Sequence, residues 1–464
     1  MQEQATSNGC PRCAILERRI AELESRLARL EKNSGNSSKP PSSDIVKPPR
    51  ADRKQKGKKK RKRGGQPGHP KHARPAFPPE QIDQTKNYQF DCCPQCDGSV
   101  QLLDQPASVL QQVELVAKPI KITEHRSLAC FCKHCQREFV KPLPRQVRKA
   151  GLTGPRLTAL VGYLKGVCHA SFTTIQNYLR DVLGLKISRG QLLKICGKVS
   201  CGLGSAYEEL LAALPRQERA NVDETGHKEN GQGLWTWCFR APLFTLFKID
   251  PSRGSEVLVE VLGAEFAGVL GCDYFSAYRK YMRLNKNVLV QFCLAHLIRD
   301  VKFLVEHPHP KNRAYGKRVL KHLRDLFAVF HRREKMSRSR FLVELDDQGL
   351  IVESEATFRV PNTPEAQNLA RRFRMHGDSY LRFITTPDIE PTNNLAEQAI
   401  RFVVIDRRIT QGTRGEAGRR WCERIWTAIA TCTQHGKSVF HFLHQSVKAQ
   451  FYAAPPPSLL FNTS

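Results

Sequence analysis

Three carboxylates in this chain have the types and positions of ligands for divalent metal ions. Asp223 lies in RANVDETG, Asp273 ends GVLGCD, and Glu397 lies in PTNNLAEQAIR, where a helix begins. Two acids at strand ends and a third on a later helix can hold two ions such as Mg²⁺ or Mn²⁺. Such a pair activates a water or a DNA 3′-hydroxyl and stabilises the leaving oxygen of a phosphodiester. The three acids therefore predict a site for metal-dependent cutting and joining of DNA.

The elements around these acids predict how they come together. From residue 218 the pattern changes to three strand-like runs, followed by a helix, a strand, a helix and a strand. That is the element order of a ribonuclease-H-like sheet, in which the first and fourth strands are neighbours. Asp223 and Asp273 would then lie side by side, and Glu397 would arrive on a later helix.

Other acids compete for these roles. Glu224 adjoins Asp223, but side chains alternate along a strand, so Glu224 would point to the opposite face. Glu390 precedes Pro391 and lies outside the expected helix. A single acid is usually a solvated carboxylate, so the prediction depends on all three acids appearing in fold order.

Polar residues one helical turn from Glu397 extend the expected site. They would present two amides and a guanidinium towards DNA, from Asn393, Asn394 and Arg401. The long interval before Glu397 predicts a helical insertion at about residues 300–385. Within it, residues 311–340 carry eleven Lys or Arg against two acids. That segment suits either a DNA-gripping face or a solvated helix pair.

The overall charge indicates the partner. The chain has 464 residues and carries 74 Lys+Arg against 44 Asp+Glu, a net charge of +30, which points to a polyanion. No apolar run approaches the length of a membrane-spanning helix, and MQEQATSNGC lacks the form of a signal peptide. We therefore expect an intracellular protein that binds double-stranded DNA and no membrane.

Two Cys-x-x-Cys pairs predict a zinc ribbon over residues 88–140. Strand-like sequence separates the pairs, and four thiolates suit a tetrahedral structural Zn²⁺ site. Cys92, Cys130 and His134 are neighbours that could exchange with a ligand, and a metal-free hairpin is the plainer alternative. The expected ligands are Cys93, Cys96, Cys132 and Cys135. Isolated cysteines in apolar segments are expected to be buried thiols, namely Cys168, Cys196, Cys238, Cys293 and Cys432.

A short coiled coil is expected at residues 14–32. Its apolar positions alternate steps of four and three, at Leu16, Ile20, Leu23, Leu27 and Leu30. The alternative is an amphipathic helix packed on its own chain, but the linker that follows favours a homodimer or higher oligomer. The preceding Cys10-x-x-Cys13 could bind a zinc ion shared by two chains, or remain two free thiols.

Two further segments could contact DNA. Residues 33–80 form a Ser-, Asn- and Pro-rich linker with a basic run at 53–63, which suits phosphate contacts that do not depend on sequence. Its central residues are Lys58, Lys59, Lys60, Arg61, Lys62 and Arg63. Residues 152–205 predict two helices, the second capped by Ser188. They are either a helix-turn-helix or two ordinary packed helices; in the first case Arg189, Gln191 and Lys194 would contact DNA.

Motifs along nearly the whole chain resemble one family, the bacterial insertion-sequence sixty-six transposases. They are NSSKPPSSD, GGQPGHP, the two Cys-x-x-Cys pairs, VDETG, CDYFSAY, FCLAHLIRD and PTNNLAEQAIR. The resemblance implies a DDE transposase with Asp223, Asp273 and Glu397 as the metal triad. It also implies that Cys293, His296 and Arg299 lie near the active site. On their residues alone, the cysteine and histidine could belong to a second metal site, but a second pair of ligands is missing.

These segments together predict a multidomain α+β protein. A ribonuclease-H-like α/β catalytic domain with the helical insertion would span residues 215–440, and a tail would follow at 441–464. The coiled coil, the zinc ribbon and the helix-turn-helix-like region would precede it. The resemblance further implies element ends and target DNA as substrates, small accessory proteins of the same element, and a cytoplasmic, nucleoid-associated location.

Two other functions fit parts of the sequence. A catalytically inactive zinc-ribbon and helix-turn-helix regulator would bind DNA without Mg²⁺ and cut nothing. A nuclease of the same fold would cut without joining. Nucleotide-driven chemistry is disfavoured, because HGKS at 435–438 lacks the first glycine of a phosphate-binding loop. No Gly-x-Ser-x-Gly elbow is present either.

Overall fold

The computed structural model describes residues 11–33, 36–37, 76–86, 91, 94–99, 109–113, 115–116 and 119–461. The chain divides into two compact units, residues 50–124 and the remainder. Within residues 50–124, the described positions hold one short 3-10 helix, η2 (Pro79–Gln81). The basic run at 53–63, Cys10 and Cys93 lie outside the described residues, as do the side chains of Cys13 and Cys132.

A five-stranded sheet forms the centre of the larger unit. Its order is β5-β4-β3-β6-β7, with β3 antiparallel to β4 and parallel to β6. Helices α6 (Ser255–Leu262) and α7 (Ser276–Leu284) connect the last three strands in sequence. The expected order of elements and the pairing of the first with the fourth strand are confirmed. The strands are β3 (Arg219–Glu229), β4 (Gln232–Arg240), β5 (Thr245–Asp250), β6 (Val269–Cys272) and β7 (Leu289–Phe292).

The first hairpin of the sheet follows from its turn residues. Asn230 and Gly231 connect β3 to β4, and both have positive φ, at 48° and 83°. Two-residue hairpin loops of this kind match the right-handed twist of the strands, and Asn-Gly adopts them at the lowest steric cost. The turn therefore fixes the register that pairs Asp223 with Cys238 across the two strands.

A helix protects the open edge of the sheet. Side chains of α14 (Glu416–Gln434) accept hydrogen bonds from backbone N–H groups of the edge strand β5. Four residues of helix and two residues of strand advance by similar lengths, about 6 and about 7 Å, so the two rows stay in step. An edge satisfied in this way is closed to pairing with another chain. The pairs are Thr245 N to Thr431 Oγ1 (3.1 Å), Phe247 N to Thr427 Oγ1 (3.0 Å) and Ile249 N to Glu423 Oε1 (2.8 Å).

Helices that precede the five-stranded sheet share its core. Ser171 and Ser188 cap α4 and α5 through the N–H groups of Thr174 and Gln191, as expected for Ser188. Helix α5 then continues past the expected boundary at 205, and its Leu210 is fully buried in the main core. The helices are α2 (Arg145–Ala150), α3 (Pro155–Gly166), α4 (Phe172–Asp181), α5 (Arg189–Ala213) and η3 (Leu214–Arg216).

The C-terminal segment, expected at 441–464 as a packed or frayed end, packs on the helices that precede the sheet. Helix α15 (Val439–Tyr452) packs against α3 and α5, with Leu443 and Val447 fully buried. Leu459, beyond the helix, is also buried. The segment forms a packed helix because its apolar residues recur at helical spacing, although a Pro-rich stretch follows them.

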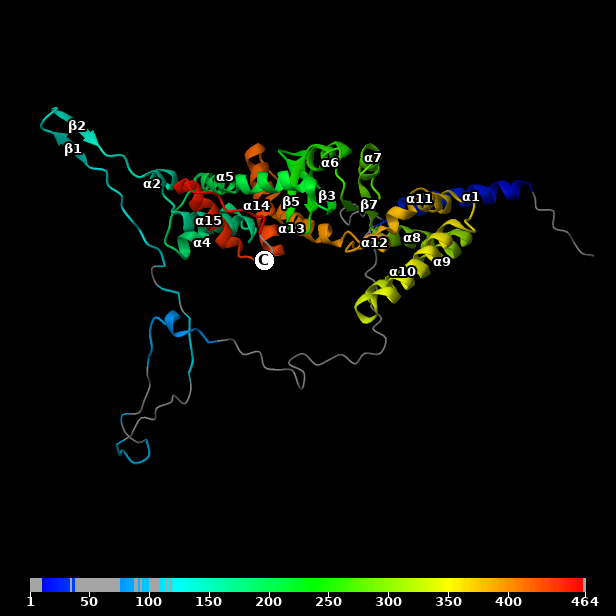
Figure 1. Ribbon diagram of the computed structural model, residues 1–464, viewed down its shortest axis with the longest axis horizontal. Coiled ribbons are helices and arrows are strands. Elements are labelled where there is room, and N and C mark those ends of the chain that lie inside the picture. The colour runs from blue at the N-terminus through cyan, green and yellow to red at the C-terminus, as the bar shows by residue number, and fades with distance from the viewer. Residues whose placement is uncertain are drawn as a thin grey trace, which may run out of the picture. The chain divides into compact units, whose positions relative to one another are not determined.

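The expected insertion at about residues 300–385 consists of helices joined by short loops, with no strand. Helices α9 and α10 run side by side (Figure 1). The helices between β7 and α14 are α8 (Leu294–Glu306), α9 (Pro310–His331), η4 (Arg333–Lys335), α10 (Arg338–Thr357), α11 (Pro364–Tyr380), α12 (Arg382–Thr385) and α13 (Asn394–Thr410). The N-terminal helix α1 (Pro11–Leu30) covers the expected coiled coil.

The cysteines divide by environment. Cys196, Cys238, Cys293 and Cys432 are buried as expected, whereas Cys168 is exposed, because it lies just beyond the end of α3. The second Cys-x-x-Cys lies on the hairpin of β1 (Ala129–Cys132) and β2 (Arg137–Val140). The first lies in the other compact unit, so the zinc ribbon stays a prediction.

No helix in the described part of the chain is both long and apolar enough to cross a membrane.

Candidate active site

Two aspartates are placed level with each other by the parallel pair β3 and β6. Asn221 pairs with Gly271 in the register of these strands, and the same offset puts Asp223 opposite Asp273. Gly271 allows the close approach, because a Cβ atom there would lie 2.4 Å from the Asn221 amide nitrogen. The Asp273 carboxylate is held in place by the backbone N–H of Phe275, which donates to it at 2.8 Å.

Asn393 attaches the start of α13 to the strand that carries Asp223. Its side-chain amide donates to the Val222 carbonyl at 2.7 Å and accepts from the Asn221 amide at 2.9 Å. Its backbone N–H donates to the Cys293 sulfur at 3.2 Å. Asparagine at this N-cap position usually bonds to its own helix, but here no such bond forms. The side chain is used instead to fix the first turn of α13, with Glu397, beside β3.

Residues of the C-x-A-H-x-x-R segment, Cys293 to Arg299, lie beside the Glu397 carboxylate. His296 Nδ1 lies 3.6 Å and Arg299 Nη2 3.5 Å from Glu397 Oε1. Burial, followed by the charge of Arg299, lowers the pKa of His296 to about 4, so the imidazole is neutral at neutral pH. Asn394 and Arg401 lie on the same helix, and both are exposed.

The three acids share one electrostatic environment. Burial raises the pKa of Asp223 well above its usual value, and repulsion from Glu224, Asp273 and Glu397 raises it further. Burial and the nearby Glu224 raise the pKa of Asp273 to about 7. Carboxylates that repel one another in a partly buried site are a fitting oxygen-donor set for Mg²⁺ or Mn²⁺, which would relieve the repulsion.

A tighter group of possible ligand atoms has a different composition. Cys293, His296 and Glu397 each offer an atom within 4.8 Å of the others, which the three acids, among the residues described, do not. Burial raises the pKa of the Cys293 thiol to about 11, so it stays protonated at neutral pH. A thiol must lose its proton to bind a metal well. Hard divalent cations therefore suit the all-carboxylate set better.

The competing acids already have partners. Glu224, whose side chain is 2% exposed, receives hydrogen bonds from Arg253 Nε and Nη2 at 2.9 and 2.7 Å and from the Tyr278 hydroxyl. Arg253 also lies over the ring of Phe275, 4.0 Å from its centroid. Glu390 forms an ion pair with Arg333. Sequence spacing gave no signal for the partners of Glu224, because they come from loops and helices far from it in sequence.

A cleft opens beside the strand residues that precede the two aspartates. Its volume is about 800 Å³, and its lining includes Asn221 and Gly271 from the sheet. Guanidinium groups of Arg219, Arg333 and Arg338 line the cleft together with Asp388, Glu390 and many apolar side chains. Because Glu390 also pairs with Arg333, the lining is of mixed charge rather than strongly basic.

The residues expected to contact DNA differ in their solvent exposure and in their ion pairs. Arg189 and Lys194 are exposed and Gln191 is half-buried, with Arg189 donating to the Thr173 hydroxyl at 2.8 Å. In the basic segment 311–340, several charges are balanced, since ion pairs join Arg318 to Glu355, Arg332 and Arg340 to Glu344, and Arg333 to Glu390. That segment is therefore less cationic than its composition indicates.

The raised pKa values lead to a test on the metal-free protein. Below about pH 4 the folded and unfolded chains both hold the Asp273 proton. As the pH rises to about 7, the unfolded chain releases its proton first, so the contribution of this group to stability falls. In chelator, we expect Asp273→Asn to melt roughly 5 °C above wild type at pH 8. The gap should close near pH 4.5, as measured by calorimetry.

The control is the exposed acid Glu390, replaced by Gln. Its melting temperature should track wild type at both pH values. Equal melting of Asp273→Asn and wild type at pH 8 would mean that the aspartate is not under repulsion. Mn²⁺ should raise the melting temperature of the wild type at pH 8 and should have little effect on Asp273→Asn.

The sequence of this chain is similar to two described families and to two bacterial proteins. The sequence profile described as "Transposase IS66 family" matches residues 150–420, and a family of unknown function matches residues 12–75. Two relatives come from Sinorhizobium fredii, and both are named as uncharacterized proteins. One, y4qI, is 24% identical over 335 residues, or 66% of this chain and 61% of the relative. The other, y4hP, is 22% identical over 374 residues, or 73% of this chain and 66% of the relative.

Proposed function

This chain belongs to the IS66 family of transposases, and from that premise we propose that it cuts the ends of its insertion sequence and joins them to target DNA. The products would be new phosphodiester bonds between the 3′-hydroxyl ends of the element and the target. Each step exchanges one phosphodiester for another, so no nucleotide is consumed. Double-stranded DNA at the element ends and at the target would be the substrate.

The observation that supports this proposal most is the gathering of three carboxylates from separate elements. Asp273 after β6 and Glu397 on α13 both lie close enough to Asp223 on β3 for their charges to raise its pKa. We propose that the sheet is ribonuclease-H-like and that these acids form its metal triad. Bound there, divalent cations would activate a water or a 3′-hydroxyl and stabilise the leaving oxygen.

The surrounding residues have supporting roles in this proposal. Asn393 holds α13 against β3, so that Glu397 faces the two aspartates. Arg299 limits the rotation of the Glu397 carboxylate and partly offsets its charge. His296, neutral and buried, can accept or donate one hydrogen bond beside it without adding charge. These groups position a donor set before DNA arrives.

DNA would be held by surfaces outside the triad. We propose that the basic run at 53–63 supplies phosphate contacts and that Arg189, Gln191 and Lys194 contact DNA from the start of α5. The ribbon cysteines would bind a structural Zn²⁺, and accessory proteins of the element would complete the assembly. Binding through phosphates should weaken steeply as salt rises.

The experiment combines purified full-length chain with a labelled element end, a supercoiled plasmid, Mg²⁺ and the element's accessory proteins. Plasmid joined to the labelled end is the expected product. Cleaved ends without joining would favour a nuclease of the same fold. Retention of the end without cleavage, unchanged by a chelator, would favour a DNA-binding regulator. The ratio of joined to cleaved product separates the three readings in one reaction.

A further inference from the structure

We propose that α1 uses two opposite faces. One face binds α11 of its own chain, and the other pairs in parallel with α1 of a second copy. The heptad pattern alone leaves open whether this helix packs on its own chain or on another. The structure places contacts on one side of the helix and leaves its leucines uncovered on the other. Both interactions can therefore exist at once.

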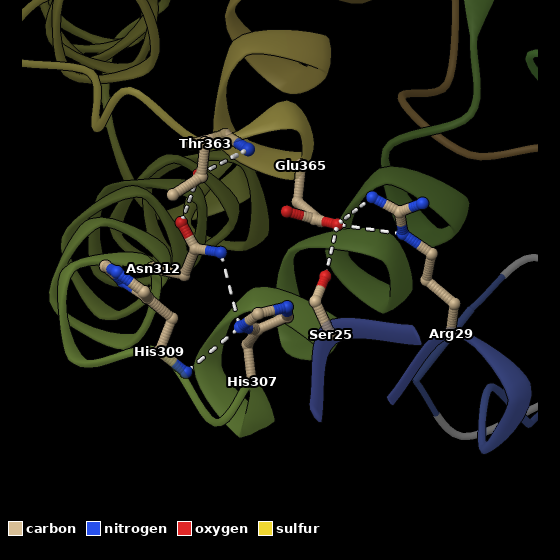
Figure 2. Close-up of polar contacts among 8 residues, drawn as sticks. Ser25, Arg29, His307, His309, Asn312, Thr363 and Glu365 are labelled. Atoms are coloured by element: carbon tan, nitrogen blue, oxygen red, sulfur yellow. Dashed lines mark hydrogen bonds and ion pairs between the residues drawn. The ribbon is translucent and has the colours of Figure 1, made fainter. Parts of the chain in front are cut away.

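The fixed face is held by Glu365, in the first turn of α11 (Figure 2). The carboxylate, 9% exposed, accepts from Ser25 Oγ at 3.1 Å and from Arg29 Nε and Nη2 at 2.9 and 2.7 Å. Beyond the helix, Lys32 Nζ lies 4.1 Å from the centre of the Phe303 ring, and Asn36 donates to Glu306 at 2.9 Å. The helix contacts at Ser25 and Arg29 are one helical turn apart and both reach α11, and the contacts of Lys32 and Asn36, beyond the end of the helix, reach α8.

The platform beneath this face is itself braced. Thr363 caps α11 and donates its hydroxyl proton to the Asn312 side chain. Asn312 in turn lies 3.3 Å from His307 Nδ1, which accepts from the backbone N–H of His309 at 3.1 Å (Figure 2). This network connects the start of α11 to α9 and to the loop before it, and so it fixes the position of the helical turn that carries Glu365.

The free face carries the heptad leucines. Leu16, Ile20, Leu23, Leu27 and Leu30 are each 53–69% exposed. With Ile20 and Leu27 at position a and Leu23 at position d, Ser25 takes position f and Arg29 position c. Positions f and c lie on the opposite side of a helix from the a/d seam. The heptad leucines and Ile20 therefore form an exposed seam on the side of α1 that faces away from α11.

Charges flanking the seam select the second copy and its direction. Arg12, Arg19 and Arg26 occupy the g positions, and Glu17, Glu24 and Glu31 occupy the e positions. In a parallel coiled coil, each g residue faces the e residue of the next heptad on the other helix, so every such pair would join Arg to Glu. In an antiparallel pair the arginines would face each other. The pattern is thus complementary to itself in one orientation.

Anchoring offsets the shortness of the seam. A helix of 20 residues is marginal alone in water. Here its conformation is already supported by Glu365, so less ordering cost remains when two copies meet. Because α1 is attached to α8 and α11, a parallel pair would also hold two candidate active sites in a defined relation. This dimer does not depend on the proposed chemistry.

The test is a charge exchange, read by analytical ultracentrifugation of the full chain at about 10 µM, where a coil of nM to µM affinity is populated. Changing Arg12, Arg19 and Arg26 together to Glu makes the flanks wholly acidic, and changing Glu17, Glu24 and Glu31 together to Arg makes them wholly basic. Wild type should sediment as a dimer, and each variant alone as a monomer. An equimolar mixture of the two variants should recover the dimer. A monomeric wild type, or variants that dimerise like wild type, would overturn the proposal.

Two further variants separate the faces. Leu23→Asp should prevent dimerisation, whereas Leu350→Asp, at an exposed leucine of α10, should not. Glu365→Ala should leave the dimer intact but raise amide exchange in α1 about tenfold, through loss of charged hydrogen bonds. Exchange that stays at the wild-type rate would mean that Glu365 does not hold the helix.

Discussion

Replacing any one of the three carboxylates with its amide should lower strand transfer by at least about 10³-fold. Metal-assisted charge stabilisation is worth several kcal/mol, and each 1.4 kcal/mol is roughly tenfold in rate. Asp223→Asn, Asp273→Asn and Glu397→Gln keep the shape of the side chain and remove its charge. The measurement is the initial rate of joined product with Mg²⁺ and accessory proteins present.

The matched control for these variants is Glu390→Gln. Glu390 lies seven residues before Glu397 in sequence, is exposed and is paired only with Arg333 among the ion pairs of the described residues. Its amide should transfer strands within about twofold of wild type. DNA binding in chelator should be equal for all four variants. A triad variant that retains more than a tenth of wild-type activity would remove that residue from the triad.

Asn393→Ala should destabilise the protein by about 2–4 kcal/mol and also slow strand transfer. The substitution leaves the Val222 carbonyl and the Asn221 amide without their buried partner, and each lost partner costs about 1–3 kcal/mol. The start of α13 would then move relative to β3, and small displacements of a catalytic group can cost about 10²-fold. Urea denaturation gives the stability, and the joining assay gives the rate.

Asn394→Ala is the control for this substitution. It is the next residue on the same helix, but its side chain is exposed. Its effect on stability should be within about 0.5 kcal/mol, because exposed substitutions away from a network rarely exceed that. If both asparagines behaved alike, the link between α13 and β3 would not be what positions Glu397.

The sheet could be predicted because its information is local. The strand-like runs from residue 218, the Asn230-Gly231 turn and the Ser188 cap each depend on neighbours in sequence. The adjacency of β3 and β6 then follows from the order of elements. This is why Asp223 and Asp273 could be predicted to lie together before their register was known.

The rest depends on contacts between distant segments. Asn393 has the sequence position of an ordinary N-cap, and only the approach of β3 explains why its amide turns away from its own helix. The sequence gives Glu224 no partner, whereas in the structure Arg253 forms an ion pair with it. The sequence left open whether the C-terminal segment is packed or frayed, because the buried face of α15 exists only against α3 and α5. No periodicity within one element encodes these pairings.

We propose that Asp223 binds a divalent metal directly, and one substitution tests this most closely. Asp223→Cys replaces a carboxylate oxygen with sulfur, which binds Mg²⁺ poorly and Mn²⁺ better. In reducing buffer, strand transfer by this variant should be absent with Mg²⁺ and partly restored with Mn²⁺, while Asp223→Ala stays inactive with both ions. Equal activity of Asp223→Cys with the two ions, or its full activity with Mg²⁺, would contradict the claim.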